Sequence, residues 1–95
     1  MASFGVGLVQ RGARPVPWIA FVPTVELPVD DEAYPRLRMI DPYDETMFSA
    51  FQCNALIADF ERLATDQPGP DRAEALKLVR RCAASSDMAI WFIGD

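Results

Sequence analysis

The sequence predicts an α+β fold, a two-layer sandwich in which two helices pack on one face of a small sheet. Two observations lead to this prediction. Short β-branched and aromatic stretches lie at both ends of the chain, and two consecutive stretches between them carry apolar residues at helical spacing. The chain has 95 residues, which is enough for one core, so we expect a single domain over 1–95.

The first 22 residues predict an N-terminal β-hairpin with strands at about 3–10 and 16–22. Apolar residues alternate along the first strand, and glycine and proline mark the turn that follows it. Gly5 and Gly7 lie within the first strand, where they indicate a bulge or a close approach of another chain segment. Pro17 cannot donate a ladder hydrogen bond, so we expect it at the start or the edge of its strand.

Residues 23–40 contain three prolines, which interrupt any long element. Val25 and Leu27 are spaced to extend the second strand, and 36–40 is predicted as a short third strand. The excess negative charge of the chain is concentrated from here to the start of the next element. The segment from Glu26 to Glu45 contains two arginines and seven acids. The acids are Glu26, Asp30, Asp31, Glu32, Asp41, Asp44 and Glu45.

A long helix is predicted over about 42–65. Asp41 or Asp44 would cap it, which would place the acids at the positive end of the helix dipole. Gln52 lies at the edge of the apolar stripe and is expected to bond to backbone. The stripe itself comprises Phe48, Phe51, Ala55, Leu56, Phe60 and Leu63.

A second helix is predicted over about 71–85, with Asp71 and Glu74 as a capping box. The chain then ends in a run of apolar residues. The strand 88–93 has no clean alternation, which is typical of a central strand covered on both faces. We expect it to insert beside the first strand.

Composition excludes several classes of function. The chain contains no histidine, which removes Ser-His and Cys-His nucleophile pairs and the commonest transition-metal ligand. The contiguous acids at 30–32 lack the alternating ligand spacing of a calcium loop. Since no catalytic or cofactor motif is present, we expect no enzyme activity, no cofactor and no metal. The net charge of −5 disfavours nucleic acid and anionic lipid as partners.

Cys53 and Cys82 fall in the two predicted helices, where buried thiols are expected rather than a disulfide. No apolar run approaches the roughly 18 residues of a membrane span. The N-terminal stretch lacks a basic leader, so we expect a cytoplasmic protein.

Tyrosines interleaved with carboxylates suit contact with a cationic surface. The sequence therefore suggests a partner-binding segment made of Asp30, Asp31, Glu32, Tyr34, Asp41, Tyr43, Asp44 and Glu45. The alternative is that the acids form a solvated face and that the tyrosines pack the loop.

The second half of the chain, roughly 41–95, resembles a set of small uncharacterised bacterial proteins. In them a segment like D-E-T-x-F-x-x-x-Q, here Asp44 to Gln52, opens a helix, and an apolar strand ending F-I-G-D, here Phe92 to Asp95, closes the chain. In size, acidity and organisation the chain is also similar to the immunity proteins that neutralise bacterial toxins. That resemblance implies a single-domain inhibitor that binds a basic toxin domain, such as a nuclease.

The sequence thus predicts a non-enzymatic protein-binding module, foremost an immunity-type inhibitor with an acidic contact surface. The alternative is a structural subunit or a homodimer that buries the edge of the hairpin, including Trp18.

Overall fold

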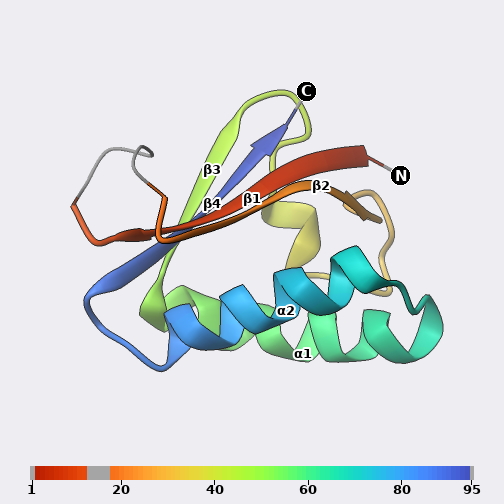
Figure 1. Ribbon diagram of the computed structural model, residues 1–95. Coiled ribbons are helices and arrows are strands. Elements are labelled where there is room, and N and C mark those ends of the chain that lie inside the picture. The colour runs from red at the N-terminus through yellow and green to blue at the C-terminus, as the bar shows by residue number, and fades with distance from the viewer. Residues whose placement is uncertain (1, 13–17, 95) are drawn as a thin grey trace.

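The computed structural model describes residues 2–12 and 18–94, which form an α+β fold with one four-stranded antiparallel sheet. The helices α1 and α2 lie side by side beneath a single face of the sheet (Figure 1). The strand order is β2-β1-β4-β3. The elements are β1 (Ala2–Gln10), β2 (Ala20–Leu27), η1 (Leu37–Met39), β3 (Glu45–Ser49), α1 (Ala50–Asp66), α2 (Pro70–Ala83) and β4 (Met88–Gly94).

The two strands from the ends of the chain form the centre of the sheet. β1 pairs with β2 as the predicted hairpin and with β4 along most of its length, from Phe4 opposite Gly94 to Gln10 opposite Met88. β4 therefore occupies the predicted central position. Phe92 of β4 is the centre of the core on the helical side. Its ring stacks on Phe60 at 6.2 Å and meets Phe48 and Phe4 edge to face at 5.6 and 6.5 Å.

The glycines of β1 have the predicted effect. The register between β1 and β2 shifts between Phe4 and Val6, so β2 forms a bulge in which Pro23 and Thr24 lie opposite Gly5. A Cβ atom on Gly7 would overlap the ring of Trp18, which crosses the strand at this point. β2 includes Val25 and Leu27 as expected, whereas its predicted first residues, Pro17 among them, lie outside the described residues.

The predicted start of the long helix is wrong by eight residues. Residues Glu45–Ser49 form β3, and α1 begins at Ala50 with Ser49 as its N-cap. Gln52 completes a capping box, since its Oε1 accepts from Ser49 N at 2.8 Å and its N donates to Ser49 Oγ at 3.4 Å. Neither Asp41 nor Asp44 caps a helix, so these acids do not lie at the positive end of its dipole. The segment from Asp44 to Gln52 is a strand followed by the first turn of a helix.

The later start also changes which residues of α1 are buried. Phe51 lies in the first turn and is 87% exposed, and Ala55 is exposed as well, although both were predicted in the apolar stripe. The buried positions are Cys53, Leu56, Asp59, Phe60 and Leu63. Phe48 is in the core as predicted, but it reaches the core from β3.

The predicted third strand at 36–40 is wrong, because this segment contains the 3₁₀ helix η1. Leu37 and Ile40 are both buried, and their spacing of three suits one 3₁₀ turn better than a strand. The predicted capping box of the second helix is also wrong. Gly69 is the N-cap of α2 and Pro70 its first residue, with no side-chain cap from Asp71. Glu74 pairs with Lys77 at 2.9 Å instead.

Candidate partner-binding surface

Both described α-helices lie on one face of the sheet, and neither covers the second face (Figure 1). The strand register places an apolar row on this second face. Phe21 of β2 lies opposite Gly7 of β1, Gly7 lies opposite Trp91 of β4, and Trp91 lies opposite Met47 of β3. Paired residues point to the same face of a sheet, so these positions form one line across all four strands. We call this surface the open face.

The hairpin contributes an aromatic pair to the open face. Trp18 stacks on Phe21 with ring centroids 5.1 Å apart and planes at 27°. The ring of Trp18 lies over Gly7, which has no Cβ to displace it. Phe21 and Met47 remain exposed, and so does Ile19 beside Trp18. Exposed large apolar side chains gathered on one face can mark a contact site.

One end of the open face is acidic. Glu45 of β3 lies opposite Ile93 of β4 and points to the same side as Met47, two residues further along the strand. On the other edge strand, Glu26 lies opposite Ser3 and alternates with the buried Val25 and Leu27. Both edge strands therefore present a carboxylate beside the same end of the apolar row.

The structure brings part of the predicted acidic segment together at this end. Asp30 and Tyr43 line one shallow hollow of about 240 Å³ with Ala2, Val29 and Pro42. The turn that carries Tyr43 is joined to the end of β4, where Gly94 N donates to Asp44 O at 3.1 Å. Tyr43 is 86% exposed. The hollow therefore lies at the same end of the sheet as Glu26 and Glu45.

The predicted carboxylates divide into two groups. Those of Asp31, Asp41 and Asp44 accept backbone N–H groups from Ala33, Tyr43 and Glu45 at 2.9, 2.8 and 2.7 Å, so they shape their own turns. Within the described part of the chain, the carboxylates of Asp30, Glu32 and Glu45 have no hydrogen-bond or ion-pair partner. They are the acids that are free to meet another molecule.

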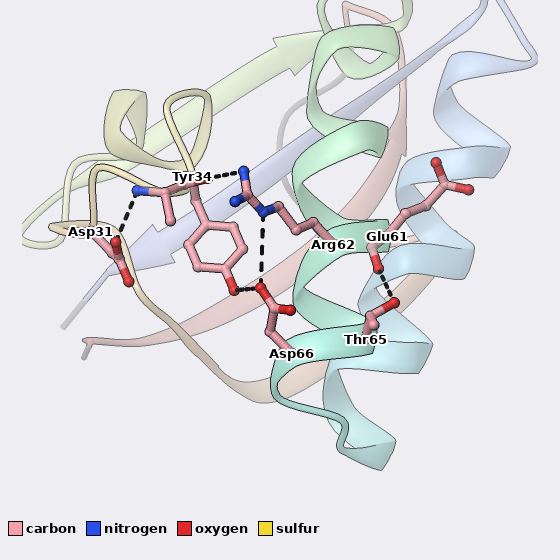
Figure 2. A network of polar contacts seen from close by, with 7 residues as sticks. Asp31, Tyr34, Glu61, Arg62, Thr65 and Asp66 are labelled. Atoms are coloured by element: carbon pink, nitrogen blue, oxygen red, sulfur yellow. Dashed lines mark hydrogen bonds and ion pairs between the residues drawn. The ribbon is translucent and has the colours of Figure 1, made fainter.

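Tyr34 does not lie on the surface where the sequence placed it, since its side chain is only 2% exposed. Its hydroxyl donates to Asp66 Oδ2 at 2.8 Å, and the Arg62 guanidinium lies 5.9 Å from the centre of its ring (Figure 2). Arg62 also donates to Ala33 O at 3.0 Å. Burial and the hydrogen bond to Asp66 raise the pKa of Tyr34 above its ordinary value. Tyr34 thus fixes the acidic loop to α1 and offers no contact surface.

Sequence reasoning missed the apolar centre of this surface. The unbroken apolar run of β4 indicated a strand covered on both faces. Ile90 and Phe92 pack in the main core, whereas on the other side Ala89 is buried but Trp91 and Ile93 are only half-buried. Trp91, on the other side, is half-buried among its neighbours in the sheet and lies under no described helix. Large residues at alternate positions of several strands are the signal that could have revealed a second apolar face.

Among the residues that the structure describes, no three Cys, Asp or Glu side chains are placed to hold a metal ion. Cys53 and Cys82 are buried free thiols, and the hydrogen bond between them, together with burial, raises the pKa of Cys53. Neither described helix has the length and apolar character needed to cross a bilayer.

Comparison with known proteins does not assign this surface. No protein family, no curated protein and no solved structure matches the chain. The candidate site therefore stands on its own geometry.

Proposed function

We propose that this protein is a non-enzymatic binding module that holds a protein partner on the open face. The observation that carries the proposal is the apolar row from Phe21 to Met47, whose two ends are exposed and which has free carboxylates at one end of the sheet. An apolar centre beside a charged rim is the usual anatomy of a protein interface. Aromatic and methionine side chains are enriched in such centres.

The charge of the surface defines the partner. Glu26, Asp30 and Glu45 lie at the same end of the sheet, and the whole chain carries a net charge of −5. A partner with a basic surface beside an apolar patch would match this arrangement, and opposite charges would speed its capture. A basic toxin domain has this chemistry. We therefore propose an immunity-type inhibitor that acts in the cytoplasm and occludes such a toxin.

The open face also favours a second candidate, a homodimer. Two sheets can pack face to face at about 10 Å, and the exposed Phe21 and Met47 would be buried by a second copy. Light scattering on the purified protein separates the candidates. A monomer at micromolar concentration supports the inhibitor, and a stable dimer that Met47→Lys dissociates supports the homodimer.

The inhibitor proposal is tested by a pull-down, in which a tagged form of this protein recovers its partner from the source cells. The test variant is Asp30→Asn/Glu45→Gln, because these two carboxylates make no contact in the described fold that the change would break. The control is Glu74→Gln/Asp87→Asn, which removes the same charge from two exposed positions elsewhere. We expect the test pair to lower recovery severalfold at about 0.15 M salt, and the control to bind like wild type. Equal recovery with both pairs would exclude the electrostatic part of the proposal.

A further inference from the structure

A groove separate from the open face lies on the helical side of β3, between η1 and α1. Its volume is about 260 Å³. Phe48 and Leu56 provide buried apolar surface, Met39 and Phe51 flank it, and Arg36 lies at its wall. Phe48 points to the side of β3 opposite Met47, so one strand separates the groove from the open face.

A buried carboxylate holds the groove in shape. Asp59 Oδ2 accepts from Arg36 N at 2.6 Å and from Leu37 N at 3.1 Å, and the Asp59 side chain is buried. These two bonds anchor the start of η1 to α1. Arg36 and Met39 are therefore presented on a fixed backbone, which lowers the entropy that binding would cost.

The groove carries a cation with no ion-pair partner in the described part of the chain, and exposed apolar side chains. Arg62, Lys77 and Arg80 each pair with a carboxylate, whereas within residues 2–12 and 18–94 no carboxylate pairs with Arg36. Met39 and Phe51 are both strongly exposed on the two sides of the groove. A cation beside an apolar hollow is complementary to a carboxylate carried next to an apolar side chain.

The dimensions favour a peptide over a free small molecule. Pockets for drug-sized ligands span about 300–1,000 Å³ and enclose most of the ligand. This groove is smaller than that range, and two of its apolar lining residues, Met39 and Phe51, are strongly exposed to solvent at its sides. One anchoring side chain would fill the hollow, and the backbone that carries it would cover the flanks.

We propose that the groove binds a short acidic segment of a partner protein. A large apolar side chain of that segment packs on Phe48 and Leu56, and an Asp or Glu close to it pairs with Arg36. This preference for an acidic ligand is opposite to that of the open face. The groove is therefore a second binding function, independent of the proposed inhibitor.

The proposal is tested with a displayed library of random twelve-residue peptides, selected on the full-length protein and counter-selected on Ala55→Trp. Ala55 lines the groove and is exposed, so tryptophan there would fill it without disturbing the core. Ala58→Trp is the control, an exposed position of α1 that does not line the groove. We expect enriched peptides with an aromatic or large aliphatic residue and an acid within four positions of it.

The affinity of an enriched peptide then decides the role of Arg36. Arg36→Glu should weaken binding at least tenfold, whereas Arg38→Glu, the same change two residues away and outside the groove, should alter it less than about threefold. Equal effects of the two changes would overturn the proposal, as would a selection that yields no peptide blocked by Ala55→Trp. Binding of free 4-phenylbutyrate as tight as that of the peptides would assign the site to small carboxylates instead. Met47→Lys should leave peptide binding unchanged, which keeps this test separate from that of the open face.

Discussion

The hydroxyl of Tyr34 donates a 2.8 Å hydrogen bond to Asp66, the last residue of α1, across 32 positions of the chain. Figure 2 shows this bond beside the contact of Arg62 with the same carboxylate, at 3.9 Å. The loop that bears Asp30 and Glu32 is thus fastened at its far side to the helical layer. A surface loop held in this way presents its free acids on a defined backbone.

Replacing Tyr34 with phenylalanine should lower the free energy of unfolding by about 1–2 kcal/mol. The ring stays buried, but its hydrogen bond to a charged group is lost, and the half-exposed Asp66 is left to water. Urea unfolding measures the change. Tyr43→Phe, which alters a side chain that is 86% exposed, is the matched control and should change stability little. Equal effects of the two changes would show that the Tyr34 hydroxyl contributes nothing.

The same contact predicts a loss of stability in alkali. The pKa of Tyr34 is raised above 10.0 by burial and by the hydrogen bond to Asp66. Because the folded pKa exceeds the unfolded one, the contribution is complete below about pH 10 and declines as the pH rises through the folded pKa. The difference in unfolding free energy between wild type and Tyr34→Phe should therefore shrink above about pH 10. A difference that stays constant up to pH 11 would contradict this assignment.

Removing the Asp59 carboxylate should release η1. In Asp59→Ala the amides of Arg36 and Leu37 lose their acceptor, and Leu37 N is buried, so we expect a loss of about 2–4 kcal/mol. Hydrogen exchange should also become faster at these two amides. Asp87→Ala, at an exposed acid outside the helices, should change stability by less than about 0.5 kcal/mol. Unchanged exchange at Arg36 and Leu37 would mean that Asp59 does not hold the turn.

Much of the fold follows from local pattern, and the errors have definite causes. The hairpin, the two helices and the central last strand are all readable because apolar spacing and turn residues agree. The start of α1 cannot be predicted in the same way. Phe48 and Leu56 fit a helical stripe whether the chain between them begins as a strand or as a helix. The capping pair Ser49 and Gln52 was the available signal for the true start.

The candidate site was only partly predictable. The acids that remain free, such as Asp30 and Glu45, lie in the segment that the sequence singled out. The burial of Tyr34 depends on Asp66, far along the chain, so no local pattern reveals it. The open face depends on the order of strands, because Phe21, Trp91 and Met47 become neighbours only when β1 and β4 pair at the centre of the sheet.

The most direct test of the open face as a binding surface is photo-crosslinking in the source cells. Benzoylphenylalanine would be placed at Met47 on the open face and, as the control, at Ala73 on the exposed side of α2. We expect the Met47 probe to form a covalent adduct with one basic protein, which mass spectrometry identifies, and the Ala73 probe to form none with it. Adducts of equal yield from both positions, or adducts of the chain with itself alone, would contradict the proposed inhibitor.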